Sequence, residues 1–265
     1  MYHRLVISYK GTSYFGWQDM GTSEQKPTQH KPTIEASIHQ VLKKICKYKS
    51  CTISAASRTD AGVHAQGQVL KISIPLAIES EKLLLGMNSL LPDDIRILQC
   101  KPCAAEFNAN KDSKSKEYHY YFCTDTIYNP VLNDIIAHIP SNSKASAAGS
   151  LDIALMQQAC KLFVGEHDFY SFAKRDTSMG STLRTLLSCD IVKAPSTFDN
   201  DVYTIKIEGK GFLRYMVRYI AGALFALGRK QIGLSDISEA LVVHKEEKLS
   251  ARAKPQGLHL IQVKY

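Results

Sequence analysis

Arg58 and Asp60 lie two residues apart within residues 57–69, and they carry the side chains with the clearest potential for chemistry in this sequence. An ionised carboxylate on a loop can act as a nucleophile or stabilise positive charge that develops on a substrate. A nearby guanidinium can contact an anionic ligand or support that carboxylate. The plainer interpretation is an aspartate that caps a turn beside a solvated arginine, so the rest of the chain must decide between the two.

The elements around this pair predict how it is positioned. Residues 51–56 are β-branched or small, and residues 69–74 alternate apolar and polar side chains. Both patterns are typical of strands, so the sequence predicts a strand, a loop and a second strand. Gly62 and Gly67 give this segment the backbone freedom to turn and to let a ligand approach closely.

Composition limits the class of protein. The chain has 265 residues, 45% of them hydrophobic and 22% charged, which is typical of a globular protein of one large domain or two ordinary ones. Its 33 Lys and Arg residues against 25 Asp and Glu give a net charge of +8, which suits a nucleic-acid partner. Seven scattered cysteines do not form a disulfide pattern, and Cys100 and Cys103 lack the second ligand pair that a zinc site needs.

No segment predicts secretion or membrane insertion. The N-terminus enters a strand-like run without a signal core, so a cytoplasmic protein is expected. The longest uncharged apolar stretch, residues 219–228, is too short to cross a bilayer and predicts part of a buried helix over 212–227. Arg218 lies in that helix. A buried guanidinium is costly without a partner, and Asp60 is the partner that we expect.

The first half predicts the order strand, helix, strand, strand, helix, strand, which favours a ferredoxin-like or split βαβ arrangement. Thr33 is the expected N-cap of the first helix, whose apolar side chains share one face. The predicted elements cover residues 2–9, 34–45, 51–56, 69–74, 81–90 and 95–100.

The second half begins with an aromatic strand at residues 116–122, in which Tyr118, Tyr120 and Phe122 share one face. This face is either core or, at Tyr118 beside Lys116, a surface on which a base stacks. The adjacent His167 and Asp168 predict a structural hydrogen-bonding turn rather than an acid–base pair.

Collected along the chain, these residues resemble the tRNA pseudouridine synthases of the TruA type. The central match is Arg58-Thr59-Asp60-Ala61-Gly62-Val63-His64-Ala65, followed by Gly67-Gln68-Val69. Shorter matches run from end to end, at residues 9–12, 16–18, 88–92, 116–120, 165–169, 211–218 and 257–258.

The resemblance implies an α+β fold of two similar mixed α/β domains, with ferredoxin-like or RRM-like antiparallel sheets and helices that form a pseudouridine synthase cleft. We expect these domains at residues 1–107 and 108–265. The family isomerises uridines in the anticodon stem-loop of tRNA, at positions 38, 39 and 40, as a homodimer. The implied reaction needs no cofactor and no metal.

The resemblance also implies roles for single residues. Asp60 is the catalytic aspartate, Arg218 pairs with it and Tyr118 packs on the target base. Arg58 helps to extrude that base, and the remaining expected substrate contacts are His64, Lys116 and Gln68. The sequence departs from the family at 107–110, which read Phe-Asn-Ala-Asn, and at 19–31, which are longer than usual. Two other functions stay open, a tRNA-binding or tRNA-folding protein without catalysis and a glycosidase that releases free base.

Overall fold

The computed structural model describes residues 1–18, 32–140, 151–174, 180–195, 200–244 and 247–265. These residues form two compact units, the first comprising Met1–Lys114 with His259–Tyr265 and the second Ser115–Leu258. The sequence predicts a boundary between residues 107 and 108 and assigns the C-terminal strand to the second half. The structure groups that strand with the first unit, where it runs parallel to the strand at residues 64–73. The predicted insertion at 19–31 lies outside the described residues.

The first unit is built on a sheet in the order β4-β1-β3-β10, whose strands are Ile95–Pro102, Tyr2–Tyr9, His64–Ser73 and Leu258–Lys264. β1 runs antiparallel to both β3 and β4, and its side chains alternate between buried and more exposed positions. β3 is buried along most of its length because it has neighbours on both edges. Its outer edge pairs with β10 at one end and with β2 (Thr52–Ala55) at the other.

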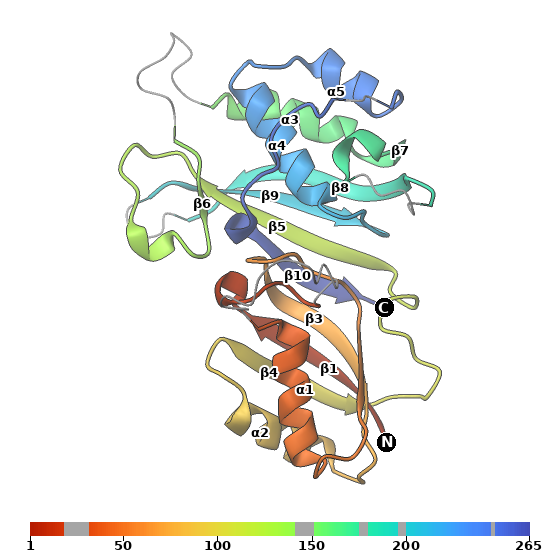
Figure 1. The fold of residues 1–265 in the computed structure, drawn as a ribbon. Helices are drawn as coiled ribbons and strands as arrows, with labels where there is room; N and C mark the ends of the chain where they lie inside the picture. Colours follow the sequence, from red (N-terminus) through yellow and green to blue (C-terminus); the bar gives the residue numbers. More distant parts are fainter. Residues whose placement is uncertain (19–31, 141–150, 175–179, 196–199, 245–246) are drawn as a thin grey trace, which may run out of the picture. The chain divides into compact units, whose positions relative to one another are not determined.

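Two helices lie together on one face of this sheet, α1 (Ile34–Ile45) and α2 (Ser80–Leu90) (Figure 1). The oxygen of the Thr33 side chain accepts a hydrogen bond from the Ala36 N–H, so the predicted N-cap is confirmed. The apolar stripe of α1 is buried against the sheet. Strand, helix, strand, strand, helix and strand follow in the predicted order.

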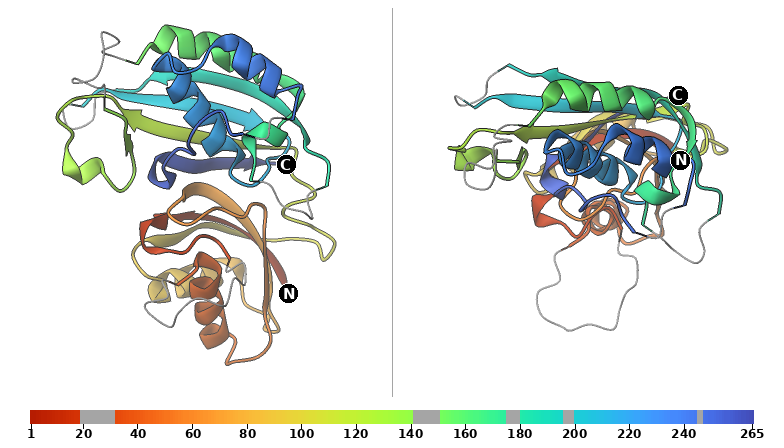
Figure 2. Two further views of the ribbon diagram at one scale, coloured as in Figure 1. Left: turned by 45° about the horizontal axis from the view of Figure 1, so that its top comes forward. Right: turned by 90° about the horizontal axis from the view of Figure 1, so that it is seen from above.

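The second unit is an antiparallel sheet in the order β5-β9-β8-β7, formed by Ser115–Cys123, Val202–Gly209, Leu183–Lys193 and Gly165–Asp168. The short β6 (Ala137–His138) runs parallel to β5. Three helices gather on one face of this sheet, as Figure 2 shows: α3 (Ile153–Leu162), α4 (Met216–Gly228) and α5 (Leu234–Ala240). The predicted α+β class is confirmed.

Helix α4 is buried on every side, which is typical of a helix inside a core. It begins at Met216 and not at Phe212 as the apolar pattern predicts. The reason is local: Tyr215 has a left-handed φ of 65°, and a residue in that conformation cannot continue a right-handed helix.

Residues 249–254, which have no regular secondary structure, run along α4 and are hydrogen-bonded to it. The Ala253 N–H donates to the Arg218 carbonyl over 3.0 Å, and Arg218 Nε donates to the Ala253 carbonyl over 2.8 Å. A methyl group on Gly222 would lie only 2.1 Å from the carbonyl oxygen of Ala251. The approach therefore depends on glycine at this position.

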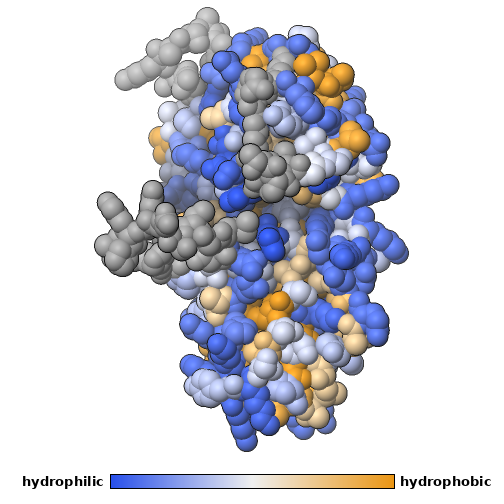
Figure 3. Space-filling view, turned by 45° about the vertical axis from the view of Figure 1, so that its right-hand side comes forward, coloured by the Kyte–Doolittle hydropathy of each residue, from blue (hydrophilic) through white to orange (hydrophobic). Residues whose placement is uncertain are grey.

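On the face drawn in Figure 3, hydrophobic residues form small patches separated by hydrophilic ones. Within the part of the chain that the structure describes, none of the helices has both the length and the apolar character needed to span a membrane.

Replacing Gly222 with alanine should lower the free energy of unfolding by roughly 1–3 kcal/mol, because the added methyl group must push the 249–254 segment away from α4. Chemical denaturation measures this change. Gly86→Ala in α2 is the matched control, since the nearest atom to its new methyl would be 3.9 Å away. This control should be neutral or stabilising by up to about 1 kcal/mol. Equal effects of the two variants would contradict the assigned packing.

Candidate active site

Asp60 lies on a tight turn in the loop between β2 and β3. Its carbonyl accepts a hydrogen bond from the Val63 N–H over 3.1 Å, and Gly62 between them has a φ of 76°. A positive φ at the third residue of such a turn favours glycine. Asp60 is half-buried, so solvent can still reach part of the residue.

The backbone on either side of Asp60 is held by the segment 11–17, which follows β1. The Trp17 N–H donates to the Thr59 carbonyl over 2.9 Å, and the Tyr9 and Thr59 hydroxyls share a hydrogen bond of 2.7 Å. Gly16, with a φ of 90°, approaches so closely that a methyl group there would lie 2.8 Å from the Thr59 carbonyl oxygen. The sequence analysis did not identify these contacts. The signal that could have found them is Gly16, which lies between the aromatic residues Phe15 and Trp17.

His64 is buried directly after the turn and is held from two directions. The Gly11 N–H donates to Nδ1 of His64 over 3.2 Å, so this nitrogen is an acceptor and the proton of the neutral ring is on Nε2. The ring stacks on that of His259 in β10, with centroids 4.5 Å apart. These contacts join the residue after the turn to the short 3-10 helix Gly11–Ser13 and to β10.

Gln68 fixes the start of the loop. Its side chain is 0% exposed, and its Nε2 donates to the Ser57 carbonyl over 2.6 Å. Its Oε1 accepts from the N–H groups of Ser57 and Val69, each over 3.2 Å. The amide thus bonds to the backbone that leads to Arg58.

Arg58 is exposed, on the same loop as Asp60. Glu35 in α1 is close enough for their charges to interact. Burial raises the pKa of Glu35, while the positive charge of Arg58 opposes that shift. The loop therefore carries a guanidinium that solvent, and hence a ligand, can reach.

In the second unit, Tyr118 lies on β5 in the predicted aromatic face. All three aromatic side chains of this face, Tyr118, Tyr120 and Phe122, are buried. Tyr118 itself is 6% exposed, and the edge of its ring meets that of Phe212 at a centroid distance of 5.0 Å.

Lys116, two residues earlier on β5, is also buried, at 8% exposure. Burial lowers the pKa of its ammonium group to about 8, because a charged group loses hydration in the protein interior.

Arg218 projects from the first turn of α4 and is 6% exposed. Besides its bond to Ala253, its guanidinium lies 5.6 Å from the ring centroid of Tyr215. The guanidinium of Arg252 packs on the same ring at 3.8 Å. The sequence did not identify Tyr215 or Arg252, because their association depends on the path of residues 249–254.

Asp168 is the centre of a separate group of hydrogen bonds. Its Oδ1 accepts from the Tyr170 N–H over 2.9 Å and from the Thr182 hydroxyl over 2.6 Å, and its Oδ2 lies 2.7 Å from Nε2 of His244. Burial alone would raise the pKa of Asp168, but the hydrogen bonds from His244 and Thr182 lower it below the ordinary value. These contacts agree with the structural hydrogen-bonding role predicted for Asp168, but His167 and Asp168 end strand β7 instead of forming a turn.

The first unit thus presents a carboxylate and a guanidinium on the loop between β2 and β3. The second unit holds an aromatic ring, a lysine and an arginine on buried elements. A carboxylate beside an exposed guanidinium on the loop of the first unit suits an enzyme that uses a carboxylate on an anionic substrate.

Comparisons with known proteins define the class further. A family model described as tRNA pseudouridine synthase matches residues 5–110 and 159–265. The chain is 51% identical over 263 residues to tRNA pseudouridine synthase A 2 of Desulfotalea psychrophila, covering 99% of this chain and 98% of that one. It is 36% identical over 264 residues to tRNA pseudouridine synthase A of Listeria innocua, with the same coverage. This chain therefore belongs to the tRNA pseudouridine synthase family.

The lowered pKa of Lys116 predicts a pH-dependent cost to stability. Between pH 8 and the ordinary pKa near 10.5, the unfolded chain binds the proton that the folded chain has released, so stability from this group rises with pH. Below pH 8 Lys116 is charged in the folded protein, so the full free-energy cost of burying its ammonium group is present. Lys116→Met should therefore be more stable than the parent at pH 7, by on the order of 2 kcal/mol.

Urea denaturation of the two proteins at pH 7 and pH 10 measures this difference. The advantage of Lys116→Met should shrink at pH 10. A difference that stays constant between the two pH values would show that burial does not perturb this lysine.

Proposed function

We propose that this protein converts uridine to pseudouridine at positions 38, 39 and 40 in the anticodon stem-loop of tRNA, with Asp60 as the catalytic carboxylate. The family membership over nearly the whole chain carries this proposal. Asp60 supports it further, because it lies in the central sequence match on a turn whose backbone is held by the 11–17 segment.

The reaction breaks the bond between N1 of uracil and C1′ of the ribose, turns the detached base and joins C5 to C1′. The proton leaves C5 and N1 gains one, so no net oxidation or hydrolysis occurs. An ionised Asp60 can attack C1′, stabilise the oxocarbenium-like state, or remove the C2′ proton. Each of these routes requires the charged carboxylate.

The target base must leave the stem before it can react, at a cost of a few kcal/mol. We assign Arg58, the exposed guanidinium on the Asp60 loop, to extrusion of that base. Tyr118 then packs on the base, Lys116 contacts the substrate, and Arg218 favours the charged form of Asp60.

His64 and Gln68 act mainly by holding the Asp60 loop. This assignment follows from their burial and from their bonds to the backbone of Gly11 and Ser57. A homodimer in the cytoplasm, with tRNA bound by both subunits, completes the proposal. The net charge of +8 supports the electrostatic part of that binding.

The function is tested with an unmodified tRNA transcript that carries tritium at C5 of its uridines. The parent protein should release tritium to water and form pseudouridine. Asp60→Asn should bind the same tRNA with a free energy of unfolding within roughly 1 kcal/mol of the parent, yet release no tritium, because the amide cannot replace the carboxylate.

Asp93→Asn is the matched control, since this exposed aspartate pairs with Arg96 on the surface of the same unit. It should retain full turnover. Tritium release by Asp60→Asn would remove Asp60 from the reaction. Binding without turnover in the parent would favour a tRNA-binding protein, and free uracil among the products would favour a glycosidase.

A further inference from the structure

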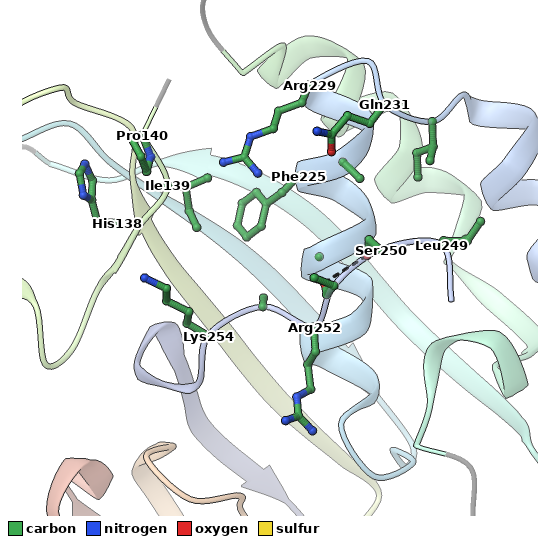
Figure 4. Close-up of a pocket in the computed structure, with 15 residues that line it drawn as sticks. His138, Ile139, Pro140, Phe225, Arg229, Gln231, Leu249, Ser250, Arg252 and Lys254 are labelled. Carbon is green, nitrogen blue, oxygen red and sulfur yellow. Dashed lines mark hydrogen bonds between the residues drawn. The ribbon is translucent and has the colours of Figure 1, made fainter. Parts of the chain in front are cut away.

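A cavity of about 440 Å³ lies in the second unit, beside the C-terminal half of α4 (Figure 4). Its walls come from that helix, from the residues just after it, from the 249–254 segment and from the end of β6. The lining residues labelled in the close-up are His138, Ile139, Pro140, Phe225, Arg229, Gln231, Leu249, Ser250, Arg252 and Lys254.

The close approach of the 249–254 segment to α4 shapes this cavity. Ala253 is buried against the helix and exchanges two hydrogen bonds with Arg218, whereas its neighbours Arg252 and Lys254 are exposed. Arg252 and Lys254 flank this buried residue directly in the chain. The positions of the charges are therefore set by buried backbone contacts.

The charged residues that line this cavity are all positive. Three lining residues carry a positive charge, Arg229, Arg252 and Lys254, and none of the fifteen lining residues is Asp or Glu. Within the described ranges, neither Arg229 nor Lys254 forms an ion pair with a carboxylate. A cavity with two such cations attracts an anion.

The three cations are not equivalent. In Figure 4, Arg229 extends from the end of α4 and Lys254 from the 249–254 segment, with Phe225 between them. Arg252 points away from both. The guanidinium of Arg252 packs on the ring of Tyr215. His138 contributes no second donor when neutral, because its Nε2 donates to the Asp125 carbonyl over 2.8 Å. Arg229 and Lys254 are therefore the groups available to an anion.

We propose that Arg229 and Lys254 form a phosphate-binding site, separate from the residues assigned to the reaction. A planar guanidinium and a mobile ammonium together match the several oxygens of a phosphate group. The phosphate is either a phosphodiester of the RNA backbone, in which case the site rests on the proposed function, or free inorganic phosphate. The volume exceeds that of a lone phosphate, which favours a longer backbone.

The RNA source is tested by measuring tRNA affinity over a series of salt concentrations. Each phosphate contact contributes about 0.9 to the slope of log affinity against log salt. Lys254→Gln should reduce this slope by about 1, and the double variant Arg229→Gln/Lys254→Gln by about 2. Lys161→Gln, which removes an exposed lysine of α3 that does not line the cavity, should leave the slope unchanged.

The free-phosphate source is tested without RNA, by comparing melting temperatures in inorganic phosphate and in chloride at equal ionic strength. If phosphate is the ligand, it raises the melting temperature of the parent and of Lys161→Gln but not that of the double variant. Since this measurement involves neither RNA nor turnover, its result is independent of the proposed function.

A smaller slope of log affinity against log salt in Lys254→Gln and in the double variant supports a site for the RNA backbone. If only the phosphate-dependent rise in melting temperature is lost in the double variant, the site binds free phosphate. If the parent and the variants agree in both measurements, or if Lys161→Gln reduces the slope as much as Lys254→Gln, the proposal is wrong. Lys254→Gln changes an exposed side chain, so it provides the test should the change at half-buried Arg229 prevent folding.

Discussion

The close backbone contact between the 11–17 segment and the Asp60 turn is the constraint on which the candidate site depends. Two glycines allow it: a methyl group at Gly11 would lie 1.9 Å from the Val63 carbonyl oxygen, and one at Gly16 would lie 2.8 Å from that of Thr59. The contact places one backbone donor, the Trp17 N–H, against the Thr59 carbonyl. The conformation of the loop therefore does not depend on side chains alone. A reacting carboxylate benefits from such preorganisation, because little reorganisation is then needed during the reaction.

In the second unit, too, a close backbone contact that a glycine allows holds a predicted site residue. Arg218 lies on a helix that is buried on every side, and the 249–254 segment exchanges hydrogen bonds with its backbone and its guanidinium. The glycine at 222 makes this approach possible. The same contact sets the positions of Arg252 and Lys254. One packing constraint thus positions a predicted site residue and the cationic wall of the proposed phosphate site.

Much of this organisation is predictable from sequence because it depends on local patterns. Side-chain alternation predicts the strands, and Thr33 predicts the start of α1. The remainder depends on contacts between residues far apart in the chain. β10 joins the first unit through pairing with β3, α4 begins late because Tyr215 takes a left-handed conformation, and Gln68 bonds to Ser57 across the loop. No local pattern encodes these three features.

The central claim is that backbone packing against the Asp60 turn permits the reaction, and turnover by Gly16→Ala tests it most directly. The added methyl group must displace the turn or the 11–17 segment, and the φ of 90° is itself unfavourable for alanine. We expect tritium release from C5-labelled tRNA to fall by at least about tenfold, equivalent to 1.4 kcal/mol in the barrier, while circular dichroism shows a folded protein. Parental turnover in folded Gly16→Ala would contradict the account.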